Sequence, residues 1–296
     1  MNKLPPNLSF VVLCGVSLVL WFRPLVDTFA LASEDSKYTH IILILPIVIA
    51  LIFQGWKVGS AEPQFWLPAG GLSLISLLVA GGARWGSRSD LGLTIEMAGL
   101  VSWWVASFVF CFGPRAFRSF CFPLLFLFWM VPLPETVLDP IIAGLQHWST
   151  LAAQLLFWIS RVPVSRDATT LLIPGLEIDV TAECSSIRSS MMLVVTTMVL
   201  SYVLVRTPWR RALVIALAIP LSIAKNGLRI FVIAMLGTRV DETFLTGRFH
   251  HQGGIVFFLI ALAVMFLILW MMRRGEQSLR GQTAFSDATS VPLPPG

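Results

Sequence analysis

Charged residues are scarce in this chain of 296 residues, since Asp, Glu, Lys and Arg make up only 12% of it and hydrophobic residues make up 56%. The mean hydropathy is +0.81. A soluble domain of this size does not carry so much apolar surface, so the composition excludes that class. Apolar runs of about 17 to 25 residues, long enough to cross about 30 Å of hydrocarbon as helices, recur along the chain. The composition therefore predicts a polytopic helical membrane protein.

Cysteine is also scarce, and this excludes two kinds of scaffold. The four cysteines are scattered, mostly within hydrophobic runs, which indicates neither a disulfide framework nor a zinc ribbon. The formal net charge of +5 is no argument for a nucleic-acid partner, because basic residues normally flank membrane helices. His250 and His251 lack the His-Glu-x-x-His spacing of a zinc protease. We therefore expect no metal and no cofactor.

The predicted fold class is an all-α polytopic membrane protein of about eight transmembrane helices, with an interfacial or re-entrant helix and a short β-hairpin on the outer face. The predicted spans lie near 8–28, 39–55, 65–82, 95–112, 119–131, 184–205, 212–236 and 253–272.

The stretch between the fifth and sixth predicted spans differs from the others. It opens with the prolines Pro132, Pro134 and Pro140, which favour breaks in a helix. It then turns apolar over 141–159. We interpret this apolar part as the interfacial or re-entrant helix, and not as a ninth span.

A hairpin is predicted over 169–180, directly before Cys184. Pro174 and Gly175 form a turn signal between two β-prone runs, and apolar residues alternate with polar ones in the second run. This pattern is typical of a short antiparallel hairpin. It would lead the chain straight to Cys184.

Basic residues near the spans indicate the orientation, because they favour the cytoplasmic side. They recur on alternate loops, which places both termini in the cytoplasm and puts 132–183 and 237–252 on the outer face of the plasma (inner) membrane. The basic residues that carry this prediction are Lys3, Lys57, Arg115, Arg118, Arg206, Arg210, Arg211, Arg273 and Arg274. Basic residues on the other loops, Lys37, Arg84, Arg88, Arg161, Arg166, Arg239 and Arg248, weaken this argument.

The expected domain organisation is one integral membrane domain over 1–274, with a catalytic core of about 119–272 and a disordered cytoplasmic tail over 275–296. Residues 1–32 also allow a signal-peptide interpretation, because Lys3 precedes an apolar run and Ala32 closes an Ala-x-Ala site. Arg23 and Pro24 separate the run from that site, which argues against cleavage.

Cys184 is the one cysteine outside a strongly apolar run. Under the predicted topology it begins the sixth span at its outer end, Arg229 lies inside the outer end of the seventh, and His250 lies just before the eighth. A helix N-terminus and a nearby cation favour the reactive thiolate. His250 is then a candidate general base, and Arg229 a candidate for oxyanion stabilisation, because an intramembrane arginine is usually functional. Asn226 lies on the same helical face as Arg229.

Each of these residues also has a structural interpretation. A lone cysteine at a helix end is more often structural than catalytic. Arg229 paired with a carboxylate such as Glu183 would be only a packing device, and His250 with His251 would be an interfacial pair. Their coincidence at one predicted depth is what favours the catalytic interpretation.

Over most of its length the sequence resembles the exosortase/archaeosortase family of membrane peptidases. The resemblance rests on ordered segments: Tyr38-Thr39-His40, Phe122-Pro123-Leu124-Leu125 through Val131-Pro132-Leu133-Pro134, Cys184-Ser185-Ser186-Ile187-Arg188-Ser189, Asn226-Gly227-Leu228-Arg229-Ile230, and His250 with Gly254 and Phe257-Phe258.

The resemblance implies that Cys184 is the nucleophile of a sortase-like cysteine protease or transpeptidase, with Arg229 and His250 as its partners. Ser185, Arg188 and Asn226 would be supporting residues, as would His251, the alternative to His250. His250 is favoured because its spacing to Gly254 matches the family. Ser186 stands where the family usually has glycine.

The partners implied by the resemblance are exported proteins whose C-terminal sorting signals comprise a short motif, a transmembrane helix and a basic cluster. Such a tail would enter laterally from the lipid bilayer. The recognition motif, the acyl acceptor and the oligomeric state stay open.

The rival interpretation is a non-enzymatic transporter or assembly subunit in which Lys225 and Arg229 bind an anionic solute. A rhomboid-like serine protease is disfavoured, because the chain's Gly-x-Ser sequences are followed by Leu.

Overall fold

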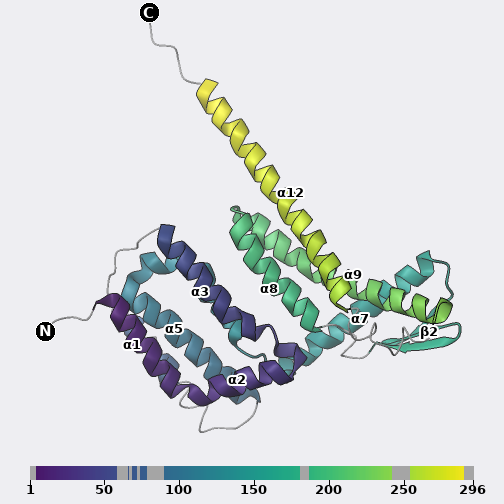
Figure 1. Cartoon of the computed structure of the whole chain (residues 1–296), viewed down its shortest axis with the longest axis horizontal. Helices are drawn as coiled ribbons and strands as arrows, with labels where there is room; N and C mark the ends of the chain where they lie inside the picture. Colours follow the sequence, from purple (N-terminus) through teal and green to yellow (C-terminus); the bar gives the residue numbers. More distant parts are fainter. Residues whose placement is uncertain are drawn as a thin grey trace, which may run out of the picture. The chain divides into compact units, whose positions relative to one another are not determined.

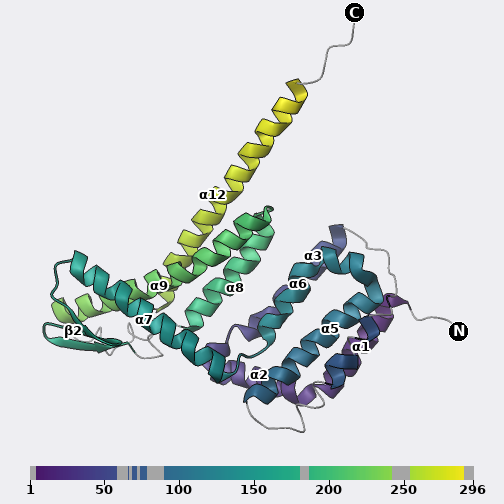
Figure 2. The ribbon, with the colours of Figure 1, turned by 180° about the vertical axis from the view of Figure 1, so that it is seen from behind.

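The computed structural model describes residues 5–58, 66, 69–71, 74–78, 90–180, 187–241 and 254–289. The chain divides into two compact units, Met1–Asp139 and Pro140–Gly296. Both are mainly helical, and the second also holds a small sheet (Figures 1 and 2).

The first unit is a set of apolar helices. Its elements are α1 (Pro6–Leu20), α2 (Phe22–Glu34), the 3-10 turn η1 (Ser36–Tyr38), α3 (Ile41–Val58), α5 (Asp90–Ser119), α6 (Cys121–Phe126) and η2 (Leu127–Met130). Helix α5 kinks at Gly113, whose φ of 78° suits a residue without a side chain. On both sides of the kink, aromatic rings pack around Cys111, which has no exposed surface. That thiol is part of the core, as expected of a cysteine in an apolar run.

Two hydrogen bonds hold the proline-rich turn that follows η2. The Tyr38 hydroxyl donates to the carbonyl of Leu133 at 2.8 Å, and the Thr94 hydroxyl donates to the carbonyl of Pro132 at 2.8 Å. The Tyr38 segment and the Pro132–Pro134 segment, both quoted above for the family resemblance, are therefore in contact. The turn leads directly into the next helix.

The second unit contains most of α7 (Glu135–Ile159), the strands β1 (Ser165–Asp167), β2 (Thr170–Ile173) and β3 (Leu176–Asp179), and the helices α8 (Ile187–Leu204), α9 (Pro208–Arg239) and α12 (Gly254–Thr289). The apolar helix expected over 141–159 is present, but it begins earlier, at Glu135. It continues through Pro140, since one proline removes one backbone hydrogen bond and the surrounding structure tolerates the loss.

The predicted hairpin is confirmed. Strands β2 and β3 pair antiparallel with Leu171 opposite Ile178, and Gly175 in the turn has a φ of +85°. A third strand, β1, pairs with β2 and was not expected, because Ser165-Arg166-Asp167 is short and polar. The sheet order is β1-β2-β3.

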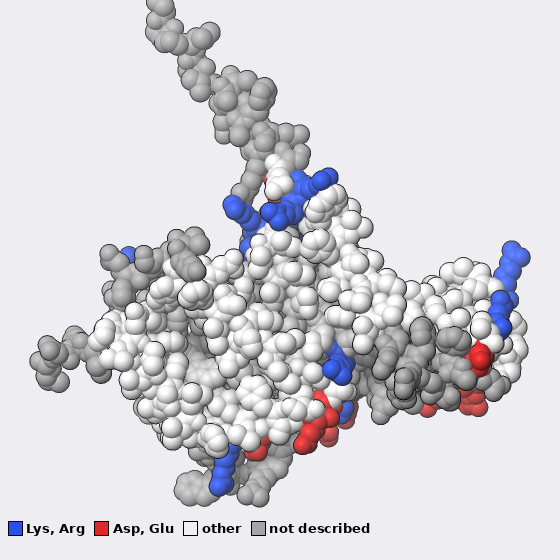
Figure 3. Space-filling view, viewed as in Figure 1, with Lys and Arg blue, Asp and Glu red and all other residues white. Residues whose placement is uncertain are grey.

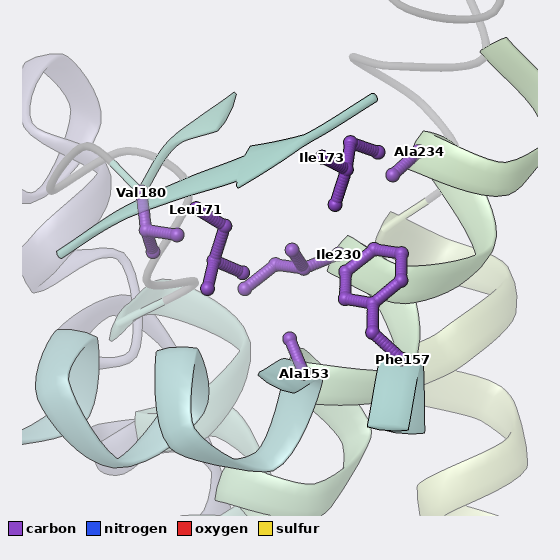
Figure 4. Packing of buried hydrophobic residues seen from close by; sticks show 7 residues of the cluster. All are labelled: Ala153, Phe157, Leu171, Ile173, Val180, Ile230 and Ala234. Atoms are coloured by element: carbon purple, nitrogen blue, oxygen red, sulfur yellow. The ribbon is translucent and has the colours of Figure 1, made fainter. Parts of the chain in front are cut away.

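One face of the sheet packs on α7 and α9. Figure 4 shows the buried side chains of this cluster, in which sheet residues meet α7 and α9: Ala153, Phe157, Leu171, Ile173, Val180, Ile230 and Ala234. The chain that leads toward Cys184 is thereby attached to α9.

Helices α8, α9 and α12 lie side by side in both views of the ribbon (Figures 1 and 2). Near Leu204, an apolar cluster of Val205, Val214, Ala218, Met265 and Leu269 joins them. Beside it, Glu276 of α12 accepts backbone hydrogen bonds from Arg206 (3.0 Å) and Thr207 (2.8 Å). Helix α12 thus contacts the α8–α9 turn through these hydrogen bonds. The helix continues to Thr289, into the segment for which the sequence predicts disorder. The predicted division into a 1–274 domain and a tail stays a prediction.

The structure supports between five and seven membrane spans. Five helices are long and apolar enough by themselves, and two bent helix pairs pass the same criterion together. One pair is α1 with α2, bent by 74°, where the sequence predicts one straight span over 8–28. Half of the predicted span over 65–82 lies outside the described residues, so the count of eight is not confirmed.

Candidate active site

The central element of the candidate site is one turn of α9, from Lys225 to Arg229. Lys225 is 5% exposed and Asn226 is 1% exposed, and Gly227 is buried as well. Three consecutive positions of a helix point in directions that differ by about 100° each. This turn of α9 is therefore enclosed on several sides, although it contains two cationic residues.

Gly227 is the position where α9 approaches α7 closely. A Cβ atom at Gly227 would lie 2.5 Å from the Cβ of Ala152 and 3.0 Å from the backbone nitrogen of Ala153. Only a residue without a side chain fits there. Gly227 thus sets how closely α7 can approach the site.

Lys225 connects α9 to α8. Its Nζ donates a short hydrogen bond to the Oγ of Ser189, in the first turn of α8. The chain enters α8 at Ile187, which is 5% exposed, three residues after Cys184 in the sequence. The C-terminal end of the segment that carries Cys184 is therefore fixed against this turn of α9.

The N-terminal end of that segment is fixed as well. Val180 is 1% exposed and belongs to the cluster that packs on Ile230, the residue after Arg229. Its carbonyl accepts a hydrogen bond from Nε2 of Gln146 in α7 at 3.1 Å.

Arg229 lies next to the start of α12. The nearest atom to a Cβ placed on Gly254 would be the Cζ of Arg229, at 4.0 Å. Gly254 is the first residue of α12 and follows His250 by four residues. The N-terminal ends of α8 and α12 both lie beside this part of α9 (Figure 2).

Asn226 has unused hydrogen-bonding capacity. Neither its Oδ1 nor its Nδ2 has a partner among the described residues, and the same holds for the buried hydroxyls of Ser190 and Ser222. A buried amide without partners costs about 1–3 kcal/mol. An Asn amide has both donor and acceptor, so it suits a peptide group.

The sequence-predicted residues divide into two groups. Arg229 and Asn226 lie together on α9, and Arg188 is exposed in the first turn of α8. Cys184, Ser185, His250 and His251 lie outside the described residues, so their predicted roles stay predictions.

Lys225 and Ser189 are the residues whose contact the sequence did not indicate. Lys225 lies one helical turn before Arg229, so the sequence alone predicts that both are on the same helical face. The sequence does not predict the contact of Lys225 with Ser189, because Ser189 is distant in sequence. Serine in the first turn of a helix is common, so only the fold identifies Ser189.

The fold and this site define a polytopic helical membrane protein with a polar cluster enclosed among its helices. The transmembrane exosortase family (Exosortase_EpsH) matches residues 32–267, well over half of the chain, so the chain belongs to that family. The match includes parts of both units and the whole Lys225–Arg229 turn with Ser189. No curated protein and no solved structure matches the chain.

Proposed function

We propose that this exosortase is a membrane cysteine protease or transpeptidase that cleaves the C-terminal sorting signals of exported proteins, with Cys184 as nucleophile. One observation carries the proposal: the described ends of two segments, those that bear Cys184 and His250, converge on the turn of α9 that bears Arg229. Family membership supports the reaction class.

The covalent chain limits how far the two undescribed residues lie from this turn. A chain extends by at most about 3.6 Å per residue. Cys184 lies four residues after Val180 and three before Ile187, and His250 lies four before Gly254. Each is thus within about 14 Å of an anchored backbone position, which makes contact with one substrate carbonyl feasible.

In the proposed reaction the Cys184 thiolate attacks the carbonyl carbon of the scissile peptide bond. Arg229 and Asn226 donate hydrogen bonds to the oxyanion that forms. The intermediate collapses to a thioester, and the departing amine takes a proton from His250. Water or an amine acceptor then attacks the thioester and loses a proton to His250, and the C–S bond breaks to release the Cys184 thiolate.

The charge distribution supports an outer-face site. Lys and Arg gather where α9 begins and α12 leaves the other helices (Figure 3). There Arg206 and Arg273 line a recess of about 260 Å³, and Arg210 Nη1 donates to the carbonyl of Met272 at 3.1 Å. This basic end is opposite to the end of α8 and α12 beside Arg229. Because basic residues favour the cytoplasmic side, we place the Arg229 turn toward the outer face.

Substitution of Cys184 tests the proposal. The full chain is co-expressed with an exported reporter that ends in a motif, a transmembrane helix and a basic cluster, taken from a host protein. Cys184→Ala should abolish processing, because no other group supplies the acyl-accepting sulfur. Cys14→Ala, which alters a half-buried thiol of α1, should process normally. Undiminished processing by Cys184→Ala would refute the proposal.

A transporter or assembly subunit that binds an anionic solute is the second candidate. It is favoured by Lys225, which has no carboxylate in ion-pair distance within the described part of the chain. Labelling Cys184 with a membrane-impermeant thiol reagent separates the two functions. An enzyme loses its activity on labelling, whereas a transporter of this kind keeps it.

A further inference from the structure

Burial of the Lys225 ammonium group carries a large free-energy cost. Lys225 lies inside α9, which is long and apolar enough to be a candidate membrane span, and the residue is 5% exposed. The only ion pair among the described residues joins Lys37 to Asp35, so no carboxylate there balances the Lys225 charge. Its described partner is one neutral hydroxyl, that of Ser189.

Such an arrangement does not stabilise the fold. Transfer of an ammonium from water to a protein interior carries a large penalty, and a single neutral hydrogen bond returns only about 0.5–1.5 kcal/mol. Arg229, one turn further along α9, adds a second cation. An apolar side chain of the same length would be tolerated at least as well. Within the described part of the chain, stability therefore does not account for this lysine.

The position of its hydrogen bond indicates a different role. One apolar cluster that joins α8 to α9 and α12 lies near Val205 and Val214, at the far end of α8 from Ser189. At the near end, Lys225–Ser189 is the described polar link between the two helices. It fixes the rotation and height of the first turn of α8 relative to the turn that bears Arg229.

We propose that Lys225 is a positioning residue that acts through Ser189: it aligns the start of α8, and with it the Cys184 segment, with Arg229. The proposal rests on the proposed function. It assigns Lys225 no contact with substrate, so its effect passes through the Ser189 hydroxyl. Misplacement of a reacting group by about 1 Å lowers rates about 10²-fold.

The test uses the full chain in detergent or nanodiscs with the sorting-signal reporter, and measures kcat, KM and thermal unfolding. Lys225→Met should lower kcat about 10²-fold, leave KM within about twofold, and unfold at the same or a higher temperature. Ser189→Ala should lower kcat by a similar factor, and Ser189→Thr, which keeps the hydroxyl, should restore most of it. Arg239→Met removes an exposed cation of the same helix and should change nothing.

The double variant Lys225→Met with Ser189→Ala decides whether the two residues act together. Its loss of kcat should equal that of either single variant, because both break one link. Multiplied losses would overturn the proposal, and so would a wild-type kcat in Lys225→Met. If Lys225→Met does not fold, Lys225 acts through stability and the proposal fails. The comparison of Ser189→Thr with Ser189→Ala tests separately whether the Ser189 hydroxyl sets kcat, and equal kcat values in the two variants would also overturn the proposal.

Failure of this inference is distinct from failure of the proposed function. Cys184→Ala is run in the same assay. Processing by Cys184→Ala at the wild-type rate would refute the proposed function, whereas an inactive Cys184→Ala beside a fully active Lys225→Met would refute the positioning role alone. The alkylation rate of Cys184 by iodoacetamide, read by mass spectrometry, should fall in Ser189→Ala and recover in Ser189→Thr.

Discussion

At the residue scale, the sequence predicts a functional role for Arg229 because a cation inside an apolar run is costly and usually functional. The same argument applies to Lys225, but its partner Ser189 is distant in sequence and only the fold brings the two together. Cys111, which lies in an apolar run, is a buried core residue, as cysteines in such runs usually are. The roles of Cys184 and His250 stay predictions, because the residues themselves lie outside the described part of the chain.

Arg229 gives the residue-scale prediction. Arg229→Ala should lower kcat about 10²–10³-fold, the usual loss of one oxyanion donor. Arg229→Lys should recover only a small part, because an ammonium lacks the planar fork of a guanidinium. Reporter processing measures both variants, with Arg239→Ala as the control at the exposed end of α9. Full activity in Arg229→Ala would show that the oxyanion is stabilised elsewhere.

At the element scale, turn chemistry and apolar periodicity predicted the hairpin and the later helices well. The Pro174-Gly175 turn is present with Gly175 at positive φ, because local chemistry alone specifies it. Strand β1 was missed, because its pairing with β2 and not its own composition makes it a strand. The start of α7 at Glu135 was missed because proline is only a weak stop signal when neighbouring elements support the helix.

Helix packing at Gly227 gives the element-scale prediction. Gly227→Ala places a Cβ 2.5 Å from the Cβ of Ala152, so α7 and α9 must separate. Overpacking of this kind costs about 1–3 kcal/mol, and we expect a lower unfolding temperature together with reduced processing.

Gly144 of α7 is the matched control for that substitution. A Cβ at Gly144 meets nothing within 4 Å. Gly144→Ala should therefore be neutral or stabilising by about 0.5–1 kcal/mol, because alanine is the better helix former. Equal behaviour of the two alanine variants in a thermal unfolding series would contradict the close packing at Gly227.

At the scale of the whole molecule, composition predicted the membrane class, and the structure gives five to seven candidate spans. The predicted count of eight is not confirmed. The apolar run over 8–28, which hydropathy predicts as one straight span, contains no signal for the bend between α1 and α2. Both helices pack against α5, and a hydropathy profile contains no information on such contacts. Family membership, in contrast, was predicted from ordered motifs and is confirmed.

The orientation gives the whole-molecule prediction. Because Arg206, Arg210, Arg211, Arg273 and Arg274 flank the same end of α8, α9 and α12, that end should be cytoplasmic. A fluorescent protein that matures only in the cytoplasm, fused after Gly296, should fluoresce. An alkaline phosphatase fused at the same residue should be inactive. The reverse pair of results would place the Arg229 turn on the cytoplasmic side and contradict an exported substrate.

The central claim is that a thioester forms on Cys184, and its direct test is to trap that adduct. Trypsin releases Cys184 within the peptide 167–188, where it is the sole cysteine. After turnover of the reporter and rapid acid quenching, mass spectrometry should find this peptide joined to the carboxyl-terminal residue of the cleaved product, and hydroxylamine should release it. A reporter that is cleaved while peptide 167–188 never carries a hydroxylamine-sensitive adduct would contradict the account.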